Sequence, residues 1–225
     1  MKVTLLTYTP EPDRVVATAA RLCYSPKQPG EIWAAFTREE QKTFLERLME
    51  NGHESPLEHA SFTFSIEGVS RALSHQLVRH RIASYSQRSQ RYVADAGFNP
   101  VLPPSIAQSP TAKERFTQVI KSIRDGYTDL VKMGIPKEDA RYLLPNACET
   151  QLIMSMNARS LLNFLELRCC RRAQWEIRDL AWRIRAQVRA VAPLLFAISG
   201  PTCLAKGYCR EGTLSCGQPY EKEVD

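Results

Sequence analysis

Residues 79–92, RHRIASYSQRSQRY, concentrate side chains that bind anions. Arginine guanidinium groups bind phosphate and carboxylate with paired hydrogen bonds, and serine and glutamine add neutral donors. This composition fits a nucleic-acid patch, a phosphorylatable low-complexity tract, or the wall of a site for a small anionic molecule. The choice among the three depends on the rest of the chain.

Three further stretches carry candidate polar residues. His53, in NGHESPLEHASF, is either a turn residue with a satisfied hydrogen bond or a ligand contact. Asn163 lies in a predicted helix, where asparagine is unfavourable, so it either satisfies a buried polar neighbour or contacts a ligand. Arg141 lies in a short helix framed by prolines. The histidine spacings do not give the i, i+4 pair of a helical zinc site.

The 7 cysteines are an odd number in a chain without a secretion signal, which argues against a full disulfide framework. Cys23 and Cys148 are predicted to be small buried residues. Cys203, Cys209 and Cys216 lie near the C-terminus without a C-x-x-C spacing. We therefore predict no bound metal, while a cysteine-dependent metal or redox protein stays an alternative.

The composition of the 225 residues, 44% hydrophobic and 24% charged, is that of a folded soluble protein. No stretch reaches the roughly 18 apolar residues of a membrane span, so we expect a cytoplasmic protein without a membrane partner. The net charge is +6, from 30 basic and 24 acidic residues. The sequence has 21 arginines and 9 lysines, whereas a DNA-binding surface more often includes lysine and forms a longer basic stripe.

The periodicity of apolar residues predicts an α+β fold in one catalytic domain, 1–225, with a loop-like cysteine-containing tail at 198–225. Strands are predicted at 2–8, 61–68 and 149–157. Helices are predicted at 13–23, 38–50, from Ser70 to about Ile82, at about 111–133, between Pro136 and Pro145, at 158–171 and at 174–197. Glycine-rich phosphate loops are absent, so side chains would have to hold any nucleotide.

The sequence RHRIASYSQRS fits the pattern R-H-R, seven residues, S, and resembles the signature of the flavin-dependent thymidylate synthases. HESPLEH, DARYLLP and NARSLLNFLELR…AQWEI resemble that family's other blocks, in the same order. The similarity spans roughly residues 13–190. Four ordered blocks are far more specific than the signature alone. The resemblance implies an antiparallel sheet flanked by long helices.

The resemblance also implies an activity. Such enzymes convert dUMP to dTMP, with methylenetetrahydrofolate as carbon donor and FAD, reduced by NADPH, as reductant. They are homotetramers whose active sites are shared between subunits, and nucleic acid is not a partner. The matching cofactor-binding residues are Ser55, Arg79, His80, Arg81, Gln87, Asn157, Arg159 and Asn163. The matching dUMP-binding residues are Gln76, Arg79, Gln87, Arg88, Ser89, Gln90, Arg91, Arg141 and Arg168.

Physical chemistry agrees with these assignments. Arg91 and Arg141 suit a nucleotide phosphate, and Arg168 suits the negative charge that develops on a uracil ring accepting hydride. Arg168 and Ser89 are the candidate catalytic residues. A serine nucleophile needs an adjacent base, and the neighbours Arg88 and Gln90 cannot serve, so we expect Ser89 to position dUMP.

Two positions depart from the pattern of some members. Gln87 stands where some carry glutamate, and Arg172 where some carry histidine. Charge-dependent roles at position 87 and flavin contact at position 172 are therefore in doubt. A nucleic-acid-binding protein that stacks bases on the tyrosines of 79–92 stays the main alternative.

Overall fold

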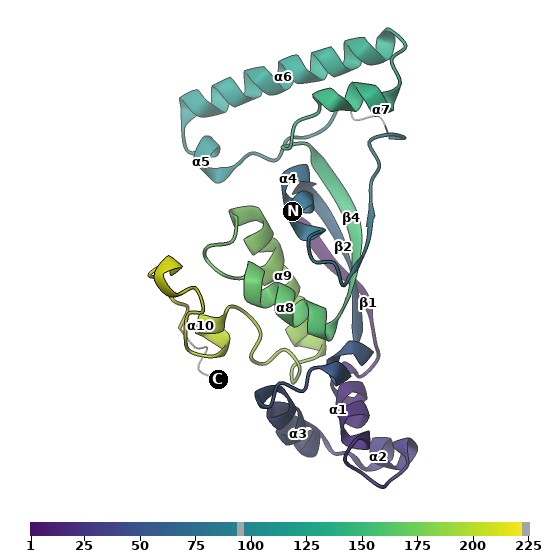
Figure 1. The fold of residues 1–225 in the computed structure, drawn as a ribbon. Coiled ribbons are helices and arrows are strands. Elements are labelled where there is room, and N and C mark those ends of the chain that lie inside the picture. The colour runs from purple at the N-terminus through teal and green to yellow at the C-terminus, as the bar shows by residue number, and fades with distance from the viewer. Residues whose placement is uncertain (94–96, 222–225) are drawn as a thin grey trace. The chain divides into compact units, whose positions relative to one another are not determined.

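The computed structural model describes residues 1–93 and 97–221 (Figure 1). A four-stranded sheet has the strand order β1-β2-β4-β3. The predicted strands at 2–8 and 149–157 are confirmed, and the one at 61–68 extends to Ser70. A fourth strand, at 84–87, lies where no strand was predicted. The strands are β1 Lys2–Tyr8, β2 Ser61–Ser70, β3 Ser84–Gln87 and β4 Glu149–Asn157.

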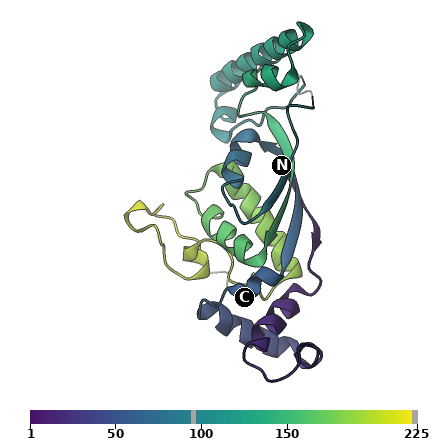
Figure 2. The same ribbon diagram turned by 45° about the vertical axis from the view of Figure 1, so that its right-hand side comes forward.

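The helices follow most of the predicted positions (Figures 1 and 2). The α-helices are α1 Pro12–Leu22, α2 Pro29–Ala35, α3 Arg38–Glu50, α4 Arg71–Leu77, α5 Pro104–Ala107, α6 Pro110–Lys132, α7 Lys137–Ala140, α8 Ala158–Arg168, α9 Trp175–Val191 and α10 Thr202–Ala205. The 3-10 helices are η1 Ser55–His59, η2 Arg141–Leu143 and η3 Gly212–Leu214. An α+β fold with an antiparallel sheet is therefore confirmed.

The chain divides into two compact units, each built from separate segments. The first unit comprises Met1–Lys2, Ile66–Arg79 and Tyr85–Ile153. The second unit comprises Val3–Ser65, His80–Ser84 and Met154–Asp225. Because β1, β2 and β4 each contribute residues to both units, neither unit is a continuous stretch of sequence.

Hydrogen bonds fix the antiparallel register of the strands. In the second unit, the Thr9 N–H donates to the Ser61 carbonyl at 2.9 Å, and the Thr63 and Ser155 hydroxyls lie 2.8 Å apart. In the first unit, the Arg88 N–H donates to the Gln151 carbonyl at 3.1 Å, next to β3. Residues in β2 and β4 alternate between buried and accessible, as expected for strands with one face packed on a core.

Two long helices build the core of the second unit. Phe164 of α8 and Ile184 of α9 are fully buried, as is Phe62 of β2, which packs edge-on against Phe196. Gln187 of α9 accepts from the Leu5 N–H and donates to the Val3 carbonyl, which ties the helix to β1. This packing fixes α8, the helix that carries three of the predicted site residues and is capped by a fourth, Asn157.

The helix predicted from Ser70 to about Ile82 is wrong at its C-terminal end. It ends at Leu77, and residues 78–83 are not helical. The Tyr85 hydroxyl donates to the Leu77 carbonyl at 2.9 Å, so a side chain of the following strand takes the place of a helical donor. Burial raises the pKa of Tyr85 to about 12, which keeps this donor protonated. The R-H-R signature therefore lies beyond the helix rather than within it.

Several other expectations need correction. The helix predicted at 174–197 ends at Val191, since Pro193 restricts the chain that follows. The tail contains the short helices α10 and η3, although residues 222–225 lie outside the described part. Cys148 is fully buried as predicted, but Cys23 is exposed just past the end of α1. Within 1–93 and 97–221, no helix is long and apolar enough to cross a membrane.

Candidate functional site

A polar cavity of about 240 Å³ lies in the first unit. The helix α4, the turn after β3, η2 and the loop before β4 supply its walls. It is lined by Arg71, His75, Gln90, Arg141, Tyr142, Leu144, Pro145 and Asn146. Two of these residues, Gln90 and Arg141, belong to the predicted dUMP set, and two others, Arg71 and His75, were not predicted.

Each polar side chain of this cavity is placed by its element. Arg71 and His75 lie four residues apart on α4, so they share one face of the helix. Gln90 is 9% exposed, and its Nε2 lies 3.4 Å from the buried Cys148 Sγ. The Arg141 Nε donates to the Glu138 carbonyl at 3.0 Å. The walls therefore hold two guanidinium groups and a buried carboxamide.

The charge of this lining indicates an anionic ligand. Among the described lining residues two are arginines and none is acidic. A planar guanidinium matches phosphate oxygens with two charge-assisted hydrogen bonds. The i, i+4 spacing of Arg71 and His75 on a predicted helix could have indicated that both side chains line one site. Neither residue was predicted, because both precede the signature motif.

The predicted residues at the end of α4 and in the segment after it differ in their burial and contacts. Gln76 is half-buried, with its Nε2 3.5 Å from the Ala72 carbonyl, whereas Arg79 is exposed just beyond the helix. The Gln87 Nε2 donates to the Thr150 hydroxyl at 3.2 Å, across the β3–β4 pair. Arg88 is exposed at the end of β3. Gln87 is thus a neutral donor to Thr150. A glutamate at this position could only accept a hydrogen bond from that hydroxyl.

Ser89 and Arg91 do not line the cavity. The Ser89 hydroxyl oxygen accepts from the Arg91 N–H at 3.2 Å, in the turn after β3. The Arg91 guanidinium is paired with the Glu138 carboxylate, with two nitrogens 3.0 Å from Oε2. Both side chains of this pair are about half exposed, so the pair contributes little to stability. Arg141 and Arg71, rather than Arg91, line the cavity.

The second unit brings together His80 and Arg168, which lie 88 positions apart in the sequence. The Arg168 Nε donates to the His80 Nε2 at 3.0 Å. The His80 ring also packs edge-on against Phe164, with the ring centroids 5.0 Å apart. Burial, and then the charge of Arg168, lowers the pKa of His80 to about 4, so the imidazole is neutral at physiological pH.

The N-cap and the N-terminal half of α8 provide three further predicted residues. The Asn157 Oδ1 caps the helix by accepting from the Ser160 N–H at 2.8 Å, as the sequence suggested. Arg159 binds Glu54 at 3.1 Å and Glu58 at 2.6 Å, which joins α8 to the segment around η1. Asn163 is exposed on α8. Ser55 and Arg81 are also exposed in this unit.

Comparison with known proteins decides the family. The family model described as "Thymidylate synthase complementing protein" matches residues 4–194. The flavin-dependent thymidylate synthase of Geobacter sulfurreducens is 51% identical over 223 residues, covering 98% of this chain and 96% of that protein. The enzyme of the same name from Clostridium tetani is 48% identical over 237 residues, covering 98% and 95%. This chain belongs to the flavin-dependent thymidylate synthase family.

The match confirms the family resemblance of the four sequence blocks and extends over the whole fold. The same-named protein of Pyrococcus furiosus is 40% identical over 222 residues, covering 95% of this chain and 91% of its own length. The family model ends at residue 194, before the cysteine-containing tail. The family motifs therefore give no information about the role of the tail.

The residues of the second unit fit a flavin cofactor of the kind the family name specifies. The Arg159 contacts with Glu54 and Glu58 place η1, which begins with Ser55, beside the N-terminal half of α8. This surface offers a hydroxyl, a carboxamide and guanidinium groups, which suit the ribose and pyrophosphate of a dinucleotide. Side chains supply these donors without a glycine-rich loop.

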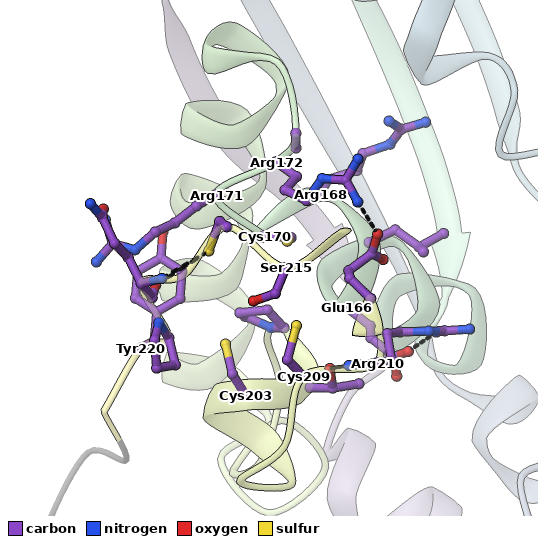
Figure 3. Close-up of a pocket in the computed structure, with 18 residues that line it drawn as sticks. Glu166, Arg168, Cys170, Arg171, Arg172, Cys203, Cys209, Arg210, Ser215 and Tyr220 are labelled. Carbon is purple, nitrogen blue, oxygen red and sulfur yellow. Dashed lines mark hydrogen bonds and ion pairs between the residues drawn. The ribbon is translucent and has the colours of Figure 1, made fainter. Parts of the chain in front are cut away.

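A second cavity, of about 310 Å³, lies between the end of α8 and the tail (Figure 3). Cys170, Cys203, Cys209 and Cys216 contribute to its lining, and all four are free thiols. In the described residues, no group of three or more histidine, cysteine or acidic side chains is arranged to hold a metal ion. Arg172 pairs with Glu211 of the tail at 2.6 Å, so in this chain position 172 anchors the tail.

Proposed function

We propose that this protein synthesises thymidylate by reductive methylation of dUMP to dTMP. Methylenetetrahydrofolate is the carbon donor, FAD is the cofactor, and NADPH reduces it. The observation that carries the proposal is membership of the flavin-dependent thymidylate synthase family over nearly the full chain. When bound, the flavin supplies the redox chemistry, and the residues of this chain bind, orient and shield the reactants.

The cavity of the first unit is the proposed site of the dUMP phosphate. Arg71 and Arg141 provide two guanidinium groups, and the carboxamide of Gln90 adds a neutral donor. This assignment keeps the predicted role of Arg141 and adds Arg71. Gln76, Arg79, Gln87, Arg88, Ser89 and Arg91 remain proposed contacts to the rest of the nucleotide, with Arg91 exchanging Glu138 for the ligand.

Arg168 is the proposed stabiliser of the uracil ring. Addition of hydride at C6 places negative charge on the ring, and a guanidinium beside N3 and O2 lowers the energy of that charge. Partial burial supports this role, because burial strengthens the electrostatic interaction of Arg168 with a bound ring. The hydrogen bond to a neutral His80 orients the group without cancelling its charge.

The proposed flavin ligands are Ser55, Arg79, His80, Arg81, Gln87, Asn157, Arg159 and Asn163. The Asn157 Oδ1 already caps α8, so its contribution would come through the amide nitrogen. We further propose that the chain acts as one catalytic domain and assembles as a homotetramer with shared active sites.

The absorbance spectrum of the purified protein tests the proposal. We expect a yellow protein with flavin bands that bleach on addition of NADPH, and dTMP formation when dUMP and methylenetetrahydrofolate are supplied. A colourless protein that FAD does not reconstitute, and whose affinity for nucleic acid falls steeply with salt, would contradict it in favour of nucleic-acid binding. Stoichiometric zinc or iron would instead favour a cysteine-centred metal protein.

Replacing Ser89 with alanine is expected to leave measurable turnover. In the unmodified enzyme, no nucleotide is expected to be covalently attached to Ser89. The Ser89 hydroxyl oxygen accepts from the Arg91 N–H, a donor that cannot remove a proton. Mass spectrometry of acid-quenched reactions would detect an adduct. A Ser89-linked nucleotide in the unmodified enzyme, or complete loss of turnover in Ser89→Ala with dUMP binding intact, would show that Ser89 is a nucleophile.

A further inference from the structure

His80, Phe164 and Arg168 form a packed cluster in the second unit. Phe164 and Arg168 are four residues apart on α8, so they lie on the same face of the helix. Phe164 is fully buried, and its ring meets the His80 ring at an interplanar angle of 80°. The cluster therefore holds the imidazole in one plane, with Nε2 directed at the Arg168 Nε 3.0 Å away.

This contact determines how Arg168 can meet a ligand. An arginine offers two edges with paired donors, one that includes Nε and one formed by the two Nη groups. The hydrogen bond to His80 occupies Nε, which leaves the Nη1–Nη2 edge as the bidentate edge. Because His80 Nε2 accepts, the neutral ring carries its proton on Nδ1.

The acceptor also matters for charge. Three other arginines of the candidate sites are held by carboxylates, which cancel much of the electric field of each arginine. These pairs are Arg91 with Glu138, Arg159 with Glu54 and Glu58, and Arg172 with Glu211. The imidazole of His80 holds Arg168 by a hydrogen bond of similar length but brings no negative charge. Arg168 thus stays a full cation in a partly buried setting, where its charge acts most strongly.

We propose that His80 is a positioning residue for Arg168, which holds the guanidinium through Nε and leaves its positive charge uncompensated for a pyrimidine ring. This role rests on the proposed function of Arg168 and is additional to any contact of His80 with the flavin. It explains why a neutral acceptor, rather than the glutamate used elsewhere in the chain, occupies this position.

The matched pair His80→Gln and His80→Glu tests the role, because the two side chains have the same shape and differ in charge. Glutamate is the stronger hydrogen-bond acceptor for arginine, so a purely structural role predicts that it is tolerated at least as well as glutamine. We expect the opposite order. Glutamine should retain most of kcat, whereas glutamate should lower it on the order of 100-fold, as when a charge-stabilising donor is lost.

The measurements are kcat and KM for dUMP at saturating FAD, flavin content by absorbance, and folding by circular dichroism. Equal kcat in the two variants, with equal flavin content, would overturn the proposal. If His80→Glu does not fold or does not retain FAD, His80→Ala replaces it. His80→Ala should then lower kcat more than His80→Gln does, and equal losses in those two variants would contradict the role.

A double-mutant cycle separates this inference from the proposed function. If His80 acts through Arg168, adding His80→Ala to Arg168→Ala should cause no further loss of kcat. Losses that multiply would contradict the positioning role while leaving the role of Arg168 intact. Near-normal kcat in Arg168→Ala alone would instead overturn the proposed function on which the inference rests.

Discussion

Replacing Arg168 with alanine is expected to lower kcat for dTMP formation about 100- to 1,000-fold, the usual cost of removing one donor that stabilises developing charge. Arg168 is half-buried at the end of α8, held by His80 through Nε. Its removal deletes the cation that we propose acts on the ring as negative charge develops. FAD should remain bound, because Arg168 is not among the residues assigned to the flavin. Steady-state kinetics and the flavin spectrum provide the two measurements.

Arg183→Ala is the matched control for this variant. Arg183 is a half-exposed arginine on α9, paired with Asp179 one turn earlier at 3.0 Å. Surface pairs of this kind contribute little to stability, so the control should keep normal turnover and normal flavin content. Turnover near the normal rate in Arg168→Ala would remove Arg168 from the catalytic set.

Replacing Arg141 with alanine is expected to raise KM for dUMP about 10- to 100-fold, with a smaller change in kcat. The substitution removes one of the two guanidinium groups of the phosphate cavity. A hydrogen bond to a charged group contributes about 1.5–3 kcal/mol, and each 1.4 kcal/mol is about tenfold in affinity. Arg71→Ala should act in the same direction, although the sequence motifs did not identify it.

Deoxyuridine, which lacks the phosphate, shows whether the loss is specific. Its weak binding should be the same in Arg141→Ala and in the unmodified protein, because the missing contact is to phosphate. Arg115→Ala serves as the control, since Arg115 is an exposed residue of α6 in the same unit. A KM for dUMP within twofold of normal in both Arg71→Ala and Arg141→Ala would place the phosphate elsewhere.

Local patterns predicted much of the fold. The alternation of apolar residues gave β1, β2 and β4, and the helical period gave α1, α3, α6 and α8, because these signals depend on residues close in sequence. The prediction for α9 was wrong by six residues at its end, and α2 was missed. Short helices such as α2 and α10 have too few residues for a periodic signal, and their boundaries depend on packing.

The strand β3 and the end of α4 were decided by tertiary contacts. Ser84–Gln87 reads as a polar loop by composition, yet the Arg88 N–H pairs with Gln151 and Gln87 bonds to Thr150. Because this pairing positions Tyr85, the Tyr85 hydroxyl donates to the Leu77 carbonyl, where the helix ends. The helix propensities of residues 78–82 could not predict this helix end, because the residues that pair with β3 belong to β4.

By itself the sequence determined the chemistry of this protein. Its arginines, glutamines and serine occur in four ordered blocks that specify the family, and this identification depends only on residue types and spacing. Only the tertiary structure decided which of these side chains work together. It enclosed Arg71 with Arg141 and paired Arg91 with Glu138. It also joined His80 to Arg168, because a hydrogen bond between residues 88 positions apart forms only when the chain has folded.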